Sequence, residues 1–111
     1  MTDPRLMRAK ERLDRLGWYP RPVTIRRVRI FVVPWLFRLP WFRRFEGHAF
    51  YETILLRTAA ATDDLITHEL CHVWQMQRRP LRMPISYLLS GYWANPYEKQ
   101  ARAAVTLTKP T

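Results

Sequence analysis

The chain has 111 residues, a formal net charge of +10 and a pI near 10.8. Residues 1–111 are expected to form one small domain, and a hydrophobic content of 48% excludes a disordered chain. The single cysteine excludes an internal disulfide framework and fits a reducing compartment. Because no apolar leader follows the N-terminal charges and no apolar stretch is long enough to span a bilayer, the sequence predicts a cytoplasmic protein.

An N-terminal helix and a linker are predicted over residues 1–22. Apolar residues recur at helical spacing in the first part of this stretch: Leu6, Ala9, Leu13 and Leu16. Gly17 is a candidate C-cap for the helix, and Pro20 and Pro22 lie in the linker that follows.

The stretch from residue 23 to residue 57 favours a small sheet. Residues 23–33 alternate apolar and basic side chains, which predicts a strand, and Arg26-Arg27 breaks the alternation and indicates a bulge. Residues 34–45 predict a loop rich in proline and tryptophan, whose rings either lie on a surface such as a membrane or pack as core. Residues 49–57 predict a second strand or one arm of a hairpin.

Residues 62–79 have the pattern of a helix with clear ends. Thr62 or Asp63 can serve as the N-cap, and the aspartates in the first turn suit the positive end of the helix dipole. Pro80 ends the helix after two arginines.

This predicted helix contains an H-E-x-x-H motif at residues 68–72. Residues four apart lie on one helix face, so the imidazoles of His68 and His72 can reach one Zn²⁺ ion. Glu69 can hold a zinc-bound water and take its proton. The alternative is a pair of histidines that only pack on a core-facing helix. Cys71 lies one position off the histidine face and is expected to fill the core rather than bind metal.

Catalytic zinc usually takes three protein ligands and leaves the fourth position for water. Glu98 is a candidate third ligand, because Asn95 reads as the N-cap of a last helix over residues 95–105. The same spacing is also a capping box, in which Glu98 would fold back onto the Asn95 backbone, and the local sequence does not decide between the two roles. His48 is the competing ligand, although a lone histidine before a strand is more typical of a surface or substrate contact.

Residues 81–93 predict a shorter helix or an irregular segment, and residues 106–111 a free tail. The expected fold class is α+β: a small, mainly antiparallel sheet packed on the H-E-x-x-H helix, with a downstream glutamate helix and an N-terminal helix. The expected site is a groove between that helix and a sheet edge supplied by residues 48–57. An extended peptide could add to this edge as a further strand.

The motif with Glu98 downstream resembles the gluzincin pattern of zinc metallopeptidases, and especially the very small minigluzincins. The letters HELCHVWQ followed by NPYE at residues 95–98 are also similar to short HELxHxxQ proteins. The resemblance covers roughly residues 46–105. It implies a minimal zincin-like domain in which His68, His72 and Glu98 hold one zinc ion, and a peptidase that is latent because it blocks itself.

Two residues depart from the gluzincin pattern. Many gluzincins have an aspartate four residues after the glutamate ligand, where this chain has Arg102. Larger relatives have an Asn-Ala-aromatic edge strand, and His48 replaces that asparagine here. The residue that orients a zinc-bound imidazole and the alignment of substrate are therefore both unassigned.

The resulting expectation is a zinc-dependent metallopeptidase in which Glu69 activates the zinc-bound water and then passes the proton to the leaving amine of a peptide or protein. Candidate oxyanion stabilisers are His48, Tyr92 and Tyr97. Self-blocking would come from residues 1–22 or from the tail. The alternatives are a zinc-binding domain without catalysis and a basic module for nucleic acid or a membrane surface; the net charge fits either an anionic partner or a merely solvated surface.

Overall fold

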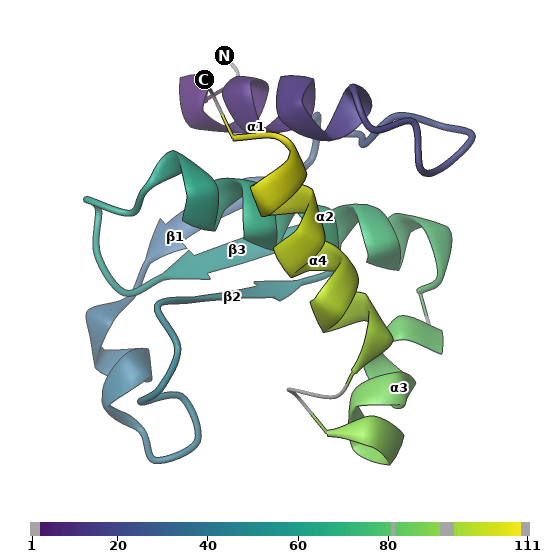
Figure 1. Ribbon diagram of the computed structural model, residues 1–111. Helices are drawn as coiled ribbons and strands as arrows, with labels where there is room; N and C mark the ends of the chain where they lie inside the picture. The colour runs from purple at the N-terminus through teal and green to yellow at the C-terminus, as the bar shows by residue number, and fades with distance from the viewer. Residues whose placement is uncertain (1–2, 81, 92–94, 110–111) are drawn as a thin grey trace.

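A computed structural model describes residues 3–80, 82–91 and 95–109, and these residues form an α+β fold. Within them lie four α-helices, a short 3₁₀ helix and a three-stranded sheet (Figure 1). None of the helices in this part of the chain combines the length and the apolar character that a membrane crossing requires.

Helix α1 spans Pro4–Asp14 and confirms the predicted N-terminal helix. Its N-cap is Asp3, whose carboxylate accepts a hydrogen bond from the Arg5 amide at 2.9 Å. The C-cap is Arg15, and Gly17 lies just beyond it with φ +60°, a left-handed conformation that glycine adopts without strain.

The sheet contains β1 (Arg29–Val32), β2 (Gly47–Phe50) and β3 (Thr53–Leu56) in the order β1-β3-β2. Strand β2 pairs with β3 in antiparallel register, whereas β1 pairs with β3 in parallel. The sheet is therefore mixed, and the expectation of a mainly antiparallel sheet is wrong for β1. The edge beside the sequence motif is β2 alone, because β3 is the central strand.

Only the last part of residues 23–33 forms a strand, because side chains take up backbone hydrogen bonds in the part before it. The Gln77 side chain bonds both the Thr24 amide (3.0 Å) and the Thr24 carbonyl (2.7 Å), which takes the place of a neighbouring strand. The Arg26-Arg27 pair lies in a turn closed by a hydrogen bond from the Val28 amide to the Ile25 carbonyl at 3.0 Å, and the predicted bulge is wrong.

The proline- and tryptophan-rich stretch is partly ordered as the 3₁₀ helix η1 (Pro34–Arg38). Residues 49–57, read as one strand or one hairpin arm, instead hold parts of both β2 and β3. The two strands meet at a tight turn over residues 51–52, where Tyr51 has φ 53°.

The three remaining helices are α2 (Asp63–Arg78), α3 (Arg82–Ser90) and α4 (Pro96–Leu107). Thr62 caps α2 through a 3.1 Å bond from the Leu65 amide, as the sequence predicts. Helix α4 extends through Leu107, so the first two residues of the expected tail are helical.

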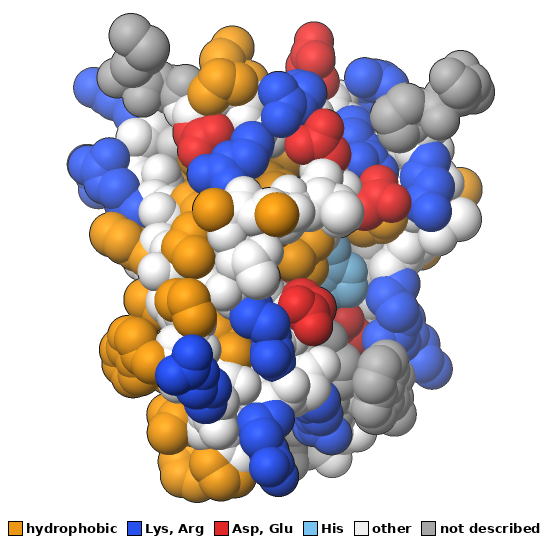
Figure 2. All heavy atoms as spheres, turned by 90° about the vertical axis from the view of Figure 1, so that its left-hand side faces the viewer, with side chains coloured by type: hydrophobic (Ala, Val, Ile, Leu, Met, Phe, Trp, Pro, Cys, Tyr) orange, Lys and Arg blue, Asp and Glu red, His pale blue; other side chains and the backbone are white. Residues whose placement is uncertain are grey.

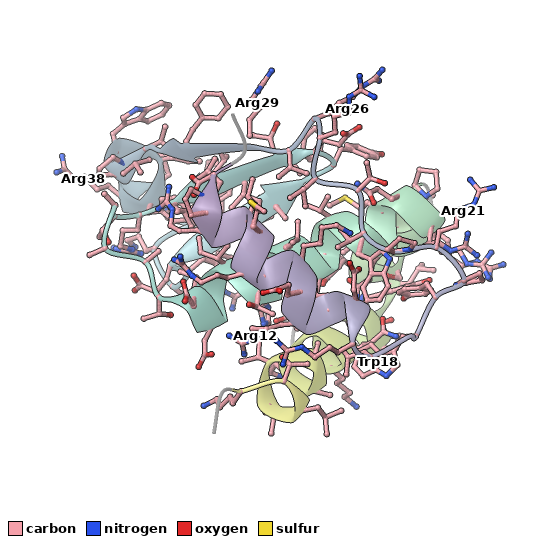
Figure 3. All side chains as sticks on the ribbon, turned by 90° about the horizontal axis from the view of Figure 1, so that it is seen from above. Arg12, Trp18, Arg21, Arg26, Arg29 and Arg38 are labelled. Atoms are coloured by element: carbon pink, nitrogen blue, oxygen red, sulfur yellow. The ribbon has the colours of Figure 1, made fainter. Side chains whose placement is uncertain are left out.

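Helix α2 is the centre of the fold: it lies between the sheet and α1, and α4 crosses it (Figure 1). The core comes from all these elements and includes Leu13, Ile54, Leu56, Ile66, Leu70, Val73 and Trp74. Arg12 of α1 extends toward α4 (Figure 3) and bonds the Thr108 hydroxyl and the Val105 carbonyl, both at 3.1 Å. This packing fixes α4 against the face of α2 that carries the motif.

Candidate metal centre

The H-E-x-x-H motif lies on α2, well inside its ends. His68 and His72 are one turn apart, and their rings meet edge to face with centroids 4.9 Å apart. Both side chains are largely buried, so their positions are set by packing as well as by helix geometry. The predicted pair of imidazoles on one face is therefore present.

Glu98, in the first turn of α4, reaches both imidazoles. One carboxylate oxygen lies 2.8 Å from His68 Nε2 and the other lies 2.8 Å from His72 Nε2. Asn95 caps α4 with its own side-chain oxygen, which accepts from the Tyr97 amide at 2.8 Å and from the Glu98 amide at 3.3 Å. The carboxylate of Glu98 is thus directed to the histidines, which favours the ligand role over the capping box.

The other ring nitrogen of His72 is held by Gln75, one turn further along α2. His72 Nδ1 lies 2.8 Å from the Gln75 side-chain oxygen. The Gln75 amide nitrogen donates to the Tyr97 carbonyl at 2.8 Å and to the Gln100 side-chain oxygen at 2.9 Å, which fixes the orientation of the amide. Because the Gln75 oxygen can only accept, His72 must carry a proton on Nδ1. In the neutral ring, Nε2 then presents its lone pair toward Glu98.

That arrangement needs a positive charge between His72 and Glu98. A carboxylate and an imidazole lone pair repel each other at 2.8 Å, unless a proton or a metal ion lies between them. In the metal-free protein a proton serves: burial alone would lower the pKa of His72, but Glu98, Glu69 and Gln75 outweigh it and raise the pKa. Burial likewise works to raise the pKa of Glu98, and hydrogen bonds from the two histidines overcome it and lower the pKa.

The donor set fits a divalent metal such as zinc. His68, His72 and Glu98 each offer one ligand atom, and these atoms lie within 4.8 Å of one another. Two nitrogens and one carboxylate oxygen make a known catalytic zinc set, in which ligand bonds of about 2.0–2.1 Å put neighbouring ligand atoms about 3.3 Å apart. The present nitrogen–oxygen pairs, at 2.8 Å, are slightly closer, so a small withdrawal of the Glu98 carboxylate would accommodate the ion.

Two further side chains contact Glu98. The Tyr87 hydroxyl of α3 donates to a Glu98 oxygen at 3.1 Å, and the Tyr87 ring lies 6.2 Å from that of His72. Arg102 places a guanidinium nitrogen 3.6 Å from the other Glu98 oxygen. Where the gluzincin pattern has an aspartate that orients an imidazole, this chain therefore has a cation beside the carboxylate.

Glu69 lies next to the triad, pressed against the edge strand. Glu69 is only 5% exposed, and burial raises its pKa, although the two histidines oppose that shift. A Cβ atom added at Gly47 of β2 would lie 3.3 Å from Glu69 Cγ, so glycine provides the room that Glu69 occupies. A carboxylate with a raised pKa beside a metal-ligand set is suited to accept and return a proton.

A cavity of about 260 Å³ opens beside Glu69, His72 and Glu98. Its other walls are mainly apolar and come from β2, α2, α3 and the residue two positions before β2: Phe45, Gly47, His48, Ala49, Phe50, Met76, Met83 and Tyr87. A second hollow, of about 490 Å³, lies beside His68 and is bordered by Arg44, Arg102 and Lys109. Carboxylates line this hollow as well: Glu46, Asp64, Glu69 and Glu98. The candidate site is therefore open on two sides, one mainly apolar and one of mixed charge.

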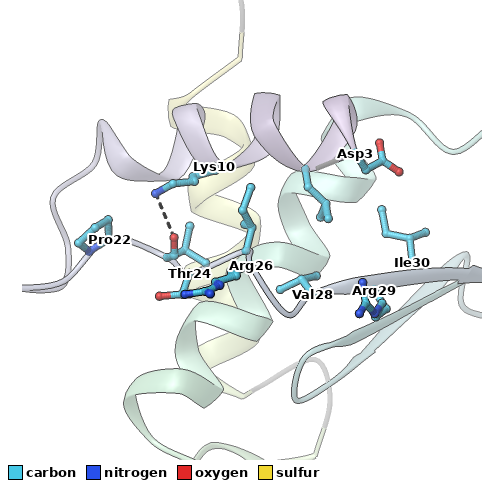
Figure 4. A pocket seen from close by; sticks show the side chains of 11 residues that line it. Asp3, Lys10, Pro22, Thr24, Arg26, Val28, Arg29 and Ile30 are labelled. Atoms are coloured by element: carbon cyan, nitrogen blue, oxygen red, sulfur yellow. Dashed lines mark hydrogen bonds between the residues drawn. The ribbon is translucent and has the colours of Figure 1, made fainter. Parts of the chain in front are cut away.

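A larger hollow, of about 710 Å³, lies away from the triad between α1 and residues 22–30 (Figure 4). Lys10 bridges it by donating to the Val23 carbonyl at 3.0 Å. Its titratable side chains are Asp3, Lys10, Arg26 and Arg29, and it includes no imidazole. Its lining thus lacks the pair of imidazoles that the triad provides.

The structure does not bring His48 into the triad. Residues Gly47 and Ala49 face α2, so alternation along β2 puts His48 on the opposite face of the sheet. Its ring contacts Phe42 and Phe45, with centroids 5.6 and 6.5 Å away. Burial lowers the pKa of His48, and His72 lowers it further. His48 nevertheless borders the apolar cavity and could contact a substrate there.

The remaining candidates divide as follows. Tyr97 contributes its carbonyl to Gln75, and its side chain lines neither cavity beside the triad. Tyr92 lies outside the described residues. Cys71 is buried, free and within the core, as expected, and burial raises its thiol pKa to about 12.

Sequence reasoning missed Gln75, Tyr87 and Gly47. Gln75 could have been found, because it follows His72 by three residues and so shares its helix face. Tyr87 and Gly47 carry no comparable signal, since their roles depend on how separate elements approach one another.

No protein-family model, curated protein or solved structure matches the chain. The likeness to gluzincins thus rests on the motif residues, and the geometry of the triad is the evidence for a functional site.

Proposed function

We propose that this chain is a zinc-dependent metallopeptidase of the gluzincin type, with His68, His72 and Glu98 as the metal ligands. The observation that carries the proposal is the convergence of both His Nε2 atoms on the Glu98 carboxylate, each at 2.8 Å, with Glu69 beside them. When bound there, a zinc ion would supply Lewis acidity and lower the pKa of water.

In the proposed reaction the protein residues position and move protons. Glu69 takes a proton from the attacking water and later delivers it to the leaving amine, a role that its raised pKa supports. Gln75 holds the His72 ring in the tautomer that frees Nε2. The Tyr87 hydroxyl lies at the cavity wall and donates to Glu98 in this structure; once it turns from Glu98, it is the proposed donor for the developing oxyanion.

The proposed substrate is an extended peptide or protein segment laid along β2. That strand is an edge of the sheet, and Gly47 brings its backbone close to Glu69. An added strand would gain main-chain hydrogen bonds from the edge and put alternate side chains into the apolar cavity.

We propose that latency arises from the C-terminal end. None of residues 3–22 lines either cavity beside the triad, whereas Val105, Thr106 and Lys109 line the one beside His68. We therefore propose that the chain around Lys109 controls access. A chain that ends at Thr108, and so lacks Lys109, should then cleave peptides faster than the full chain, and equal rates would remove latency from the proposal. A cytoplasmic location, proposed from the single cysteine, is checked by cell fractionation.

The activity is tested with Glu69→Gln in the zinc-loaded full chain. We expect hydrolysis of an unstructured protein such as casein to fall at least a hundredfold, because general acid–base catalysis contributes about 10²–10⁴-fold. Zinc content should stay the same. Glu11→Gln, on the exposed side of α1, is the matched control and should retain full activity.

Two other results would redirect the proposal. Stoichiometric zinc with no hydrolysis in any variant would indicate a metal-binding domain without catalysis. Absence of zinc at equilibrium would reject the metallopeptidase altogether.

A further inference from the structure

A surface remote from the catalytic chemistry combines exposed apolar and basic side chains. It is formed by β1 and residues 34–44 and is called the aromatic–basic face. Its apolar members are Phe31, Trp35, Leu39 and Trp41, and its basic members include Arg29, Arg38 and Arg43. Figure 2 views the side that carries η1 and shows hydrophobic and Lys/Arg side chains together over the lower part, with most acidic side chains above.

The local structure holds these side chains outward. Phe37 is 1% exposed and packs edge to face against Phe42 at 6.2 Å, which anchors the segment from inside. Trp35 and Trp41 are 63% and 71% exposed, so the rings of this segment divide into an inner and an outer set. In a 3₁₀ helix, side chains three residues apart eclipse, which places Arg38 over the same side of η1 as Trp35.

The charge around this face has one sign. Residues 15–45 contain eight arginines and no aspartate or glutamate, which accounts for most of the net charge of +10. Within the described residues, no ion pair joins Arg29, Arg38 or Arg43 to a carboxylate. Figure 3 shows Arg29 and Arg38 pointing away from the ribbon. The face therefore suits an extended anionic surface that also accepts apolar groups.

We propose that the aromatic–basic face docks on the surface of a bilayer that contains anionic phospholipids. Tryptophan rings favour the boundary between headgroups and acyl chains, and arginines beside them attract the phosphates. Leu39 adds aliphatic surface, which bases cannot stack upon, so a bilayer fits this face better than a nucleic acid strand. Trp35 and Trp41 line none of the cavities described above, which also disfavours a buried peptide or base.

The test is sedimentation of the full chain with vesicles of phosphatidylcholine, with or without phosphatidylglycerol. We expect binding to the anionic vesicles that weakens with salt. Trp35→Ser with Trp41→Ser should lower the partition coefficient by about tenfold per ring. Arg38→Ala should lower it about fivefold. The matched control is Met7→Ser with Leu107→Ser, because those residues are comparably exposed (55% and 67%) outside this face.

The proposal is independent of the metal centre and fails on any of four outcomes. These are no vesicle binding, equal binding by the tryptophan and control variants, binding to an oligonucleotide but not to vesicles, and a dimer in solution that the tryptophan variant dissociates. Circular dichroism of each variant checks that the fold is intact. Trp41→Tyr alone, which keeps an interfacial ring, should retain most of the vesicle binding of the unaltered chain.

Discussion

Replacing Gln75 by leucine tests whether the hydrogen bonds behind His72 prepare it for a metal. Gln75 is fully buried and makes three bonds: one from His72 Nδ1 to its oxygen, and two from its nitrogen, to the Tyr97 carbonyl and to Gln100. Leucine has a similar size but can make none of them. Gln100 keeps a partner, because Tyr19 donates to the same oxygen at 2.7 Å.

The magnitude follows from the two groups that lose their partner. His72 Nδ1 and the Tyr97 carbonyl are left unsatisfied, at about 1–3 kcal/mol each, so the free energy of unfolding should fall by about 2–6 kcal/mol. Zinc affinity should fall about 10–100-fold, because His72 loses the acceptor that fixes its tautomer. That loss corresponds to about 1.4–2.7 kcal/mol, so zinc should stabilise the variant less than it stabilises the wild type.

The assay is a zinc titration in competition with a chromophoric chelator, together with urea unfolding with and without zinc. Gln77→Leu is the control on the same helix, since Gln77 bonds only the Thr24 backbone. It should lower stability without changing zinc affinity. Gln75→Glu keeps an acceptor for His72 and should hold zinc within a few-fold of wild type, even though it loses the donor to Tyr97. Unchanged zinc affinity in folded Gln75→Leu would refute the reasoning.

Three other predictions concern single contacts. Gly47→Ala places a methyl group 3.3 Å from Glu69 Cγ and should displace that side chain. The rate of peptide hydrolysis should therefore fall, while the zinc affinity measured by titration stays unchanged. Full activity would show that β2 does not confine Glu69. Burial raises the pKa of the Cys71 thiol to about 12 from an ordinary value of 9.0, so iodoacetamide at neutral pH should label it only in urea. The free energy of unfolding should decline as the pH rises above about 9, because the thiol ionises first in the unfolded chain. Rapid labelling of the native protein would contradict the burial of Cys71. Arg12→Met breaks the links from α1 to α4 and Asp64 and should lower the free energy of unfolding in urea by about 2–3 kcal/mol. Arg8→Met, at the exposed Asp63 pair, should lower it much less, and equal losses would show that the buried links contribute little.

The helices could be predicted because their signals are local. Thr62, Asn95 and the prolines mark where α2 and α4 begin, and the H-E-x-x-H spacing follows directly from helix geometry. The structure of the segment before β1 could not be predicted. The Gln77 side chain, on α2, bonds the Thr24 backbone there, and only the assembled fold brings the two residues together. The parallel pairing of β1 likewise depends on how the hairpin packs, not on the alternation of the strand itself.

The part of the candidate site that depends on the spacing of residues along the sequence could be predicted. His68, Glu69 and His72 follow from five consecutive residues, and Glu98 from its place after a helix cap. Whether Glu98 is a metal ligand or part of a capping box depends on how α4 crosses α2, which no local sequence pattern predicts. The same holds for Tyr87, which reaches Glu98 only because α3 turns the chain back between the two helices.

X-ray absorption at the zinc edge of the loaded protein tests the metal ligands most directly. The account predicts one zinc per chain with nitrogen and oxygen neighbours at about 2.0–2.2 Å and with scattering from two imidazoles. In Glu98→Ala the imidazole scattering should remain, but the protein should hold zinc less tightly. Sulfur at about 2.3 Å, or a site without imidazole scattering, would contradict it.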